Sequence, residues 1–432
     1  MDKKISLSLV AIFILMPVLF LGCSSDGGKE KPLLIWHWLT DREEALNKMA
    51  QNYEGLTGQK VMFELYAPSD VYSSKVIAAG QTSTLPDIFG ILGEKRVFAS
   101  FIKAGHIMNL AEEMNRDNRK WLNQLFDKAL EVNRFREDNG FNVEPGIYGV
   151  PIDVMNIQII YNKDLFRKAG LDPDKPPETW EGFLETGKNF KGAGIQGMVS
   201  GWGEIWMIDC LASNFAFNIM GKDKIVKTYK GEIPYTDPDW VKVFSLFKDM
   251  QDSGILAKGI VIMINKNAEQ NFANGRAAMA FNGSWCVNVY ASMNPELNYG
   301  VFPPPSVSNK YPRSIWGGAG SSFMVNAKSE KKVEAVEFLK WLTAREQQVF
   351  LARETKNLPS NRLALKNIPP VLAEFADDMD IVTHPNILPV NEVSRVIEAF
   401  DKGIQSIIIG EKTPEEVAEE VDRVKKKELR KI

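Results

Sequence analysis

The stretch IYGVPIDVMNIQIIYNKDLFRKAGLDPDKPPETWEGFLETGKNF, residues 147–190, marks a change in the character of the chain. It predicts two strands back to back, at about 148–152 and 155–161, because both runs are apolar and rich in β-branched residues. Helices are expected to follow near 162–169 and 179–190. We interpret the stretch as the passage from a first α/β domain into a second.

Upstream of this passage, short apolar runs alternate with helical patterns. Strands are expected at 33–38, 60–66 and 86–92, and helices from Thr40, at about 70–80 and at 94–104. Thr40 and Glu43 have the spacing of a capping box, and Gly55 is expected to end the helix that they open. The alternating order predicts a parallel sheet with helices on both faces.

Downstream, helices are expected near 205–220 and 238–252, and a strand followed by an amphipathic helix within 317–343. Asp237-Pro238 is a strong start signal, with proline at the first helical position. Thr413 to Glu416 has the capping-box spacing again and opens the last helix. No internal repeat is visible. These elements extend the α/β pattern to the end of the chain.

Composition narrows the class of protein. A chain of 432 residues with 44% hydrophobic and 25% charged residues predicts two domains or one large one, with a buried core. A net charge of −3 gives no long-range attraction to nucleic acid. Three histidines and three cysteines show no zinc-ligand spacing, and no phosphate-binding glycine loop is present. We therefore expect no metal, no cofactor and no nucleic-acid partner.

The N-terminus has the layout of an export signal. Two lysines precede an apolar run, residues 5–21, that ends at the sequence FLGC. This ending resembles a bacterial lipobox, which implies a signal peptide at 1–22, lipid on Cys23 and a tether at 23–31. An uncleaved membrane anchor is the alternative. Two fatty chains hold a protein at a bilayer surface, so we expect an exported protein, anchored to the outer face of the cell membrane or in the periplasm.

Two further cysteines, Cys210 and Cys286, leave two interpretations open. An exported protein could pair them in a disulfide. Both also stand in apolar surroundings, which suits two buried thiols.

Several segments, in order, resemble one family. They are YEGLTGQKVMFELY, AAGQTSTLPDIF, the opening stretch, FANGRAAMAFNGSW and KVEAVEFLKWLTAREQQ followed by LPSNR. The chain resembles the solute-binding proteins of ABC importers typified by the maltose-binding protein. The resemblance implies an α/β fold of the type II periplasmic-binding-protein class, with two discontinuous lobes joined by a hinge. By the family's layout, lobe I comprises 32–148 and 317–360, and lobe II comprises 149–316 and 361–432.

The resemblance also implies what the protein does. Such proteins are not enzymes: they close their lobes on a solute and deliver it to the transmembrane subunits of a permease. We expect a monomer that captures a sugar or oligosaccharide. A sugar site needs aromatic faces for the pyranose rings and planar polar groups for the hydroxyls, because an unpaired buried hydroxyl costs about 1–3 kcal/mol.

Candidate ligand residues follow from the ten tryptophans and from the family's loops. Trp38 ends the first strand, where open parallel sheets place ligands, and Trp285 stands in the family's Gly-x-Trp motif, whose tryptophan commonly stacks on sugar. The full candidate set is Trp38, Asp41, Glu94, Asp153, Asn156, Trp202, Glu204, Trp206, Trp285, Trp316, Gly317 and Arg362. Trp180, Trp240 and Trp341 lie on amphipathic helices and are expected in the core.

Two alternatives remain at this stage. The same fold could bind a non-sugar solute, such as a phosphorylated polyol, a polyamine or an anion. A phosphate would need arginine or a glycine-rich turn, and GGAGSS at 317–322 could supply the turn, but the surplus of tryptophans favours sugar. The other alternative is a surface glycoside hydrolase, which needs two carboxylates about 5–10 Å apart. The sequence assigns no such pair.

Overall fold

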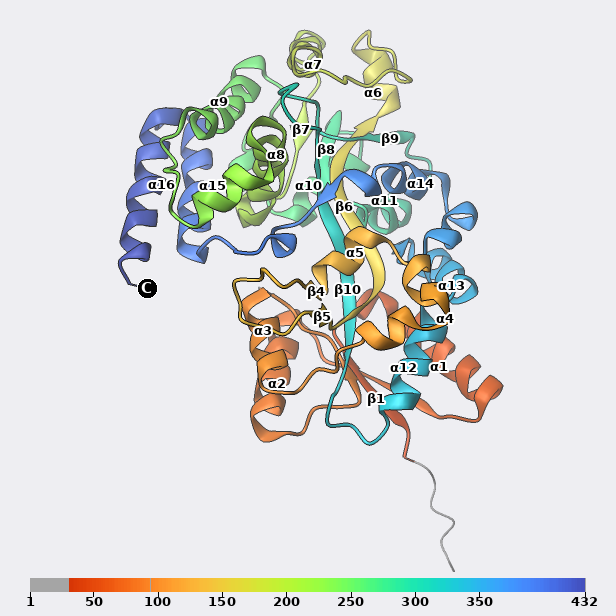
Figure 1. Cartoon of the computed structure of the whole chain (residues 1–432). Helices are drawn as coiled ribbons and strands as arrows, with labels where there is room; N and C mark the ends of the chain where they lie inside the picture. Colours follow the sequence, from red (N-terminus) through yellow and green to blue (C-terminus); the bar gives the residue numbers. More distant parts are fainter. Residues whose placement is uncertain (1–30, 94, 432) are drawn as a thin grey trace, which may run out of the picture.

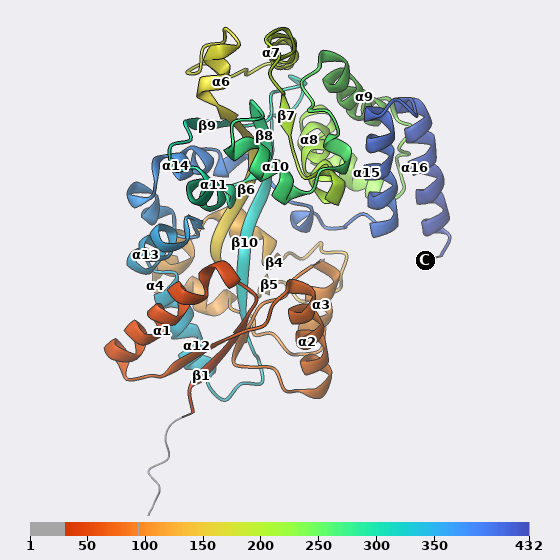
Figure 2. The ribbon, with the colours of Figure 1, turned by 180° about the vertical axis from the view of Figure 1, so that it is seen from behind.

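The computed structural model describes residues 31–93 and 95–431 and shows a two-lobed α/β protein (Figures 1 and 2). Two long strands, β6 (Val150–Asn162) and β10 (Ile315–Val325), run side by side from one lobe into the other. This is the fold class predicted from the sequence. The predicted signal peptide and Cys23 lie outside the described residues.

One sheet continues through both lobes in the order β2-β1-β3-β10-β6-β8-β7. Its outer strands are β1 (Leu33–His37), β2 (Val61–Leu65), β3 (Ile88–Phe89), β7 (Met198–Val199) and β8 (Met279–Gly283). Strands β9 (Tyr299–Phe302), β11 (Leu358–Pro359) and β12 (Val382–Thr383) pair beside this path, and β4 (Arg134–Phe135) with β5 (Gly146–Ile147) forms a separate hairpin. The predicted parallel pairing holds for β1, β2 and β3, but β10 is antiparallel to β3 and β6, so the sheet is mixed.

The opening stretch forms one strand and not the two that were predicted. The first half of β6 pairs with β10 and its second half with β8 and β9, so its backbone always has a partner. The irregularity falls on β10 instead, whose register shifts between Ala319 and Ser322. Asp153 accepts a hydrogen bond from the Ser321 N–H there, at 2.7 Å. Where the sequence predicted a break between two strands, β6 is continuous, and the irregularity is a bulge in β10 beside it.

Helices cover both faces of the sheet. Those before β6 are α1 (Glu43–Thr57), α2 (Ser69–Thr82), α3 (Lys95–Lys103), α4 (Ala111–Gln124) and α5 (Asp127–Val132). Between β6 and β10 lie α6 (Lys163–Lys168), α7 (Trp180–Gly192), α8 (Trp206–Tyr229), α9 (Pro238–Ser253), α10 (Asn265–Ala273) and α11 (Cys286–Met293). After β10 come α12 (Lys332–Leu342), α13 (Arg345–Thr355), α14 (Pro370–Asp377), α15 (Ser394–Ile408) and α16 (Pro414–Leu429).

The predicted helix starts meet different outcomes. Thr413 forms the complete capping box of α16, as the spacing indicated, and Thr179 caps α7 at the start of the helix expected near 179–190. The box predicted at Thr40 is wrong, because a 3-10 turn, η1 (Thr40–Arg42), precedes α1, which has no side-chain cap. The helix also continues past Gly55 and ends at Gly58, whose φ of 78° suits glycine.

Each lobe has its own hydrophobic core, and another cluster lies against the middle of the sheet. Trp180 and Trp240 are buried as predicted, whereas Trp341 is only half-buried. Cys210 and Cys286 are free buried thiols that belong to different clusters, so they form no disulfide with each other. Within residues 31–93 and 95–431, no helix has the length and apolar character needed to cross a bilayer.

Candidate functional site

Three of the candidate tryptophans lie together where the upper lobe meets the long strands. The upper lobe is the one that contains α6–α11, α15 and α16, at the top of Figure 1. The centroid of the Trp206 ring lies 6.1 Å from that of Trp285 and 6.4 Å from that of Trp316. The rings come from the start of α8, the turn between β8 and α11, and β10. His384 extends the group, because its ring lies 4.6 Å from that of Trp316. We call Trp206, Trp285, Trp316 and His384 the aromatic group.

Trp206 is the most exposed member of the aromatic group, at 40%. It follows the 3-10 turn η2 (Trp202–Glu204) and Ile205, whose φ of 51° is unusual for a β-branched residue. Ile205 separates η2 from α8, and Trp206, the first residue of α8, is exposed. Strained backbone of this kind persists only where surrounding contacts hold it, and it concentrates at functional sites.

The ring of Trp285 packs directly against the backbone of Gly283. A β-carbon at Gly283 would lie 1.9 Å from the nearest ring atom of Trp285, so only glycine fits beneath the ring. The Gly283 N–H donates to the side-chain oxygen of Asn282, at 2.8 Å. The Gly-x-Trp pattern is therefore a close approach of ring to backbone.

A buried carboxylate lies behind this tryptophan. Glu269, on α10, is 7% exposed. Its Oε1 accepts hydrogen bonds from the side-chain amides of Asn265 and Asn282, at 2.9 and 3.0 Å. Burial raises the pKa of Glu269, and hydrogen bonds from Asn282, Asn265 and Trp285 oppose the rise.

Glu204, also a candidate, lies close to this carboxylate. Its Oε1 accepts a hydrogen bond from the backbone N–H of Asn265, the first residue of α10, at 3.0 Å. A carboxylate at this place stabilises the start of a helix. The negative charge of Glu204 contributes to the raised pKa of Glu269. Glu204 thus joins η2 to α10 beside the aromatic group.

The last member of the group, His384, is neutral. Burial lowers its pKa to about 3, and the positive charge of Lys95 contributes. Its Nδ1 accepts a hydrogen bond from the Asn386 N–H, at 3.0 Å. The residue lies after β12, which pairs with β10 at Trp316. The imidazole therefore packs against Trp316 as an uncharged aromatic ring.

The other lobe carries Trp38, which is half-buried after β1. Its ring lies 5.0 Å from that of Tyr72, and a β-carbon at Gly90 would come within 2.3 Å of it. The Tyr72 hydroxyl accepts a hydrogen bond from the Gly90 N–H, at 2.7 Å. Both lobes thus present a tryptophan that lies over a glycine.

Two acidic candidates gather around an arginine. Arg42 forms a buried ion pair with Asp153 and a second pair with Asp41, at 3.3 Å. Asp41 is half-exposed and also accepts a hydrogen bond from Asn357. Asp153 additionally accepts from the Ser321 N–H. We call Asp41, Arg42 and Asp153 the charged group.

The remaining candidates do not join either group. Trp202 is fully buried in the upper core, 5.8 Å from the ring of Phe247. Asn156 is fully buried too, and its amide donates to the carbonyl of Phe375, at 2.6 Å. Arg362 donates to the carbonyl of Leu125. Glu94 lies outside the described residues.

Gly317 stands beside Trp316 in β10. It is opposite Asn156 in the register, and a β-carbon there would lie 2.5 Å from the Met155 carbonyl. The glycine allows β10 to lie tightly against β6 at the crossing.

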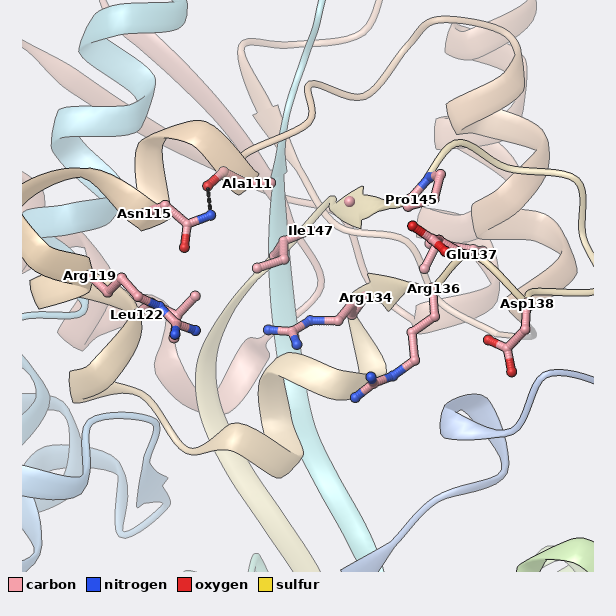
Figure 3. Close-up of a pocket in the computed structure, with 12 residues that line it drawn as sticks. Ala111, Asn115, Arg119, Leu122, Arg134, Arg136, Glu137, Asp138, Pro145 and Ile147 are labelled. Carbon is pink, nitrogen blue, oxygen red and sulfur yellow. Dashed lines mark hydrogen bonds between the residues drawn. The ribbon is translucent and has the colours of Figure 1, made fainter.

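A hollow of about 710 Å³ lies elsewhere, between α4 and the β4–β5 hairpin. Arg119, Arg134 and Arg136 line it together with two acidic residues, and none of the candidate residues does (Figure 3). Arg134 and Arg136 already pair with Glu131. Its charges are therefore mixed, and two of its three arginines are paired, which gives no preference for an anion.

Sequence reasoning missed Glu269, Asn282 and His384. Asn265 and Glu269 have the i, i+4 spacing of a hydrogen-bonded helix pair, but the segment NKNAEQNF reads as a solvated helix. His384 lies in a loop with no pattern around it. Only the folded chain brings these side chains to the tryptophans.

Comparisons with known proteins agree with this architecture. Residues 37–349 match the family described as bacterial extracellular solute-binding protein. The multiple sugar-binding protein of Streptococcus mutans is 25% identical over 83% of this chain and 85% of that protein. The sn-glycerol-3-phosphate-binding periplasmic protein UgpB of Shigella flexneri is 26% identical, over 50% of this chain and 49% of that one.

Solved structures show the same fold. The structure of a chitin oligosaccharide binding protein superposes with a TM-score of 0.72 at 23% identity, covering 91% of this chain and 98% of that one. Because the family match spans most of the chain, this protein belongs to the bacterial extracellular solute-binding protein family.

Proposed function

We propose that this protein captures a sugar or oligosaccharide between its lobes and delivers it to the permease of an ABC importer. The observation that carries the proposal is the aromatic group, in which the ring of Trp206 lies 6.1 Å from that of Trp285 and 6.4 Å from that of Trp316. Flat rings partly open to solvent are suited to stack on the C–H faces of pyranose rings. The sugar-binding relatives support the same solute class.

The charge of the proposed site favours a neutral sugar over the main alternative ligand, a phosphorylated polyol. UgpB, which binds sn-glycerol-3-phosphate, makes this alternative specific. Two carboxylates, those of Glu204 and Glu269, belong to the hydrogen-bond network beside Trp206 and Trp285. Like charges repel, so these carboxylates disfavour a phosphate and leave a neutral polyhydroxyl ligand favoured.

The proposed site has a contribution from each lobe. Trp206, Trp285 and Trp316 supply the platform of the upper lobe, and Trp38 supplies a face from the other. Asp41 contacts Arg42 and Asn357, but it is half-exposed and close to Trp38 in the chain, and we propose that it also accepts hydrogen bonds from ligand hydroxyls. Asp153, Asn156, Trp202 and Arg362 already have partners within the protein, and we propose structural roles for them.

The lobe boundaries remain those of the family layout, 32–148 with 317–360 and 149–316 with 361–432. Support comes from the two cores, because one draws on residues 33–152 and 323–351 and the other on residues 157–302 and 388–421. We also propose export, removal of residues 1–22 and lipid attachment at Cys23, on the strength of the FLGC sequence alone.

The test uses the chain from Lys31 onward and follows tryptophan fluorescence against mono- and oligosaccharides. We expect a saturable change with one sugar class, and a loss of affinity of about 30-fold or more in Trp285→Ala, as for a central aromatic contact. Trp341→Ala is the matched control, a half-buried tryptophan of the other lobe. Saturation by glycerol phosphate and by no sugar would overturn the proposal.

A binding protein should also leave its ligand intact. Incubation with the bound oligosaccharide should release no new reducing ends. Turnover that disappears in Glu204→Gln or Glu269→Gln would instead indicate a glycoside hydrolase.

A further inference from the structure

We propose that Glu269 is a positioning residue of the sugar site, whose carboxylate sets the orientation of the Trp285 ring toward the ligand. The inference rests on the proposed function, because it concerns the same site. Glu269 itself is 7% exposed and lies behind the tryptophan, so it acts through the ring.

The ring of Trp285 is held at two places. Its N–H donates to Glu269, and its six-membered edge lies against Gly283. Asn282 connects the two supports, since its amide N–H donates to Glu269 while its amide oxygen accepts from the Gly283 N–H. An indole held at its N–H and beneath its ring has little freedom to rotate.

The same network reaches Trp206. Glu269 accepts from the Asn265 amide, and the backbone N–H of Asn265 donates to Glu204. Glu204 is two residues before Trp206, across the strained Ile205. The network therefore fixes the two platforms, Trp206 and Trp285, relative to each other, which is the preorganisation that a stacking site requires.

An ionised carboxylate suits this place better than an amide. The three groups that face Glu269 are all N–H donors, from Asn265, Asn282 and Trp285. A carboxylate only accepts, whereas a glutamine would turn its own N–H₂ toward at least one donor. Glu269→Gln keeps the shape of the side chain and removes part of the hold on Trp285.

The test is a double-mutant cycle on sugar affinity, in the chain from Lys31 onward. Glu269→Gln should weaken binding about 10-fold, the value of one charge-assisted hydrogen bond. Trp285→Phe keeps an aromatic ring without the N–H and should weaken binding by a similar factor. In the Trp285→Phe background, Glu269→Gln should change affinity by less than about 2-fold, because the contact through which it acts is already gone.

Two variants control for general destabilisation. Asp422→Asn makes the same change at another buried carboxylate, which accepts from the Tyr235 N–H, and sugar affinity should stay unchanged. Asn265→Ala removes one donor to Glu269 and should weaken sugar binding less than about 10-fold, an effect that should disappear in the Trp285→Phe background. This variant keeps the inference testable if Glu269→Gln fails to fold.

The outcomes separate the inference from the proposed function. If Trp206→Ala and Trp285→Ala abolish sugar binding but Glu269→Gln retains full affinity, only the inference is wrong. A Glu269→Gln effect that persists undiminished in Trp285→Phe also overturns it. If sugars bind and neither tryptophan matters, the proposed site itself is wrong.

Discussion

Two places along the crossing strand β10 show opposite chemistry. Ser321 lies at the charged group, where Arg42 and Asp153 form a buried ion pair. Trp316, five positions earlier and about 17 Å away along an extended strand, lies in the aromatic group, whose members carry no charge and are partly exposed. Buried charges must be paired with protein groups, whereas open aromatic faces remain available. We therefore expect the charged group to determine stability and the aromatic group to determine binding.

The largest expected effect is on the charged group. Asp153→Asn leaves Arg42 without its buried partner and should lower the free energy of unfolding by about 3–5 kcal/mol, measured by chemical denaturation. Asp41→Asn, at the half-exposed partner of the same arginine, should cost less than about 1 kcal/mol. If the Asp153→Asn variant instead keeps its stability and loses sugar affinity, Asp153 is a ligand residue, and the charged group contributes to binding.

Two tryptophans four residues apart give the next test. Trp202→Ala removes a fully buried side chain and should cost about 3–5 kcal/mol of stability. Trp206→Ala, at an exposed ring, should leave the unfolding transition nearly unchanged and weaken sugar binding about 10–100-fold. Thermal unfolding and fluorescence titration on the same preparations measure both. Equal losses of stability would show that Trp206 is part of the core.

The stability of the protein should also respond to acid through His37, which ends β1 and lies near Asp41 of the charged group. Burial lowers the pKa of His37 to about 4, against 6.5 in the unfolded chain, while Asp41 opposes the shift. The unfolded chain binds the extra proton, so the contribution to stability is complete above pH 6.5 and is lost as the pH falls to about 4. The loss is about 3 kcal/mol.

Replacement of the imidazole tests this origin. Denaturation of His37→Leu between pH 7 and pH 4 should show a flatter decline of stability than the wild type. His384, whose pKa is also lowered, still contributes to the remaining slope. An unchanged slope in His37→Leu would assign the acid sensitivity to other groups.

The smallest effect concerns the thiols. Cys210 and Cys286 lie in different clusters, so a reducing agent should not shift the midpoint of thermal unfolding of the chain from Lys31. A downward shift would reveal a disulfide and would contradict the separation of these two cores.

Much of the architecture could be predicted locally. The signals at Asp237 and Thr413 predicted helix starts that the structure confirms, because a cap depends only on residues within one turn. The box at Thr40 had the same spacing and was wrong. There the chain turns through η1 so that Arg42 can reach Asp153, which is 111 positions away in the sequence. A long-range ion pair overrode a local signal.

The candidate site divides in the same way. The end of the first strand indicated Trp38, a loop that enters a helix indicated Trp206, and neighbouring glycines indicated Trp285 and Trp316. The last three do lie together. Trp202 had the same local context as Trp206, but Trp202 is buried and Trp206 is exposed, and Ile205, with its positive φ, stands between them. Glu269 could not be recognised, since its role depends on contacts with Asn282 in β8 and with Trp285.

By itself the sequence determined most of the order of strands and helices, because periodicity and caps are local properties, and its resemblance to a known family implied the two-lobed fold and a sugar ligand. Only the tertiary structure decided which tryptophans form a platform, which carboxylates are bound to protein partners, and that residues 150–162 are one strand. Those outcomes depend on hydrogen bonds and ring contacts between residues far apart in the chain, such as Trp206 with Trp316 and Arg42 with Asp153.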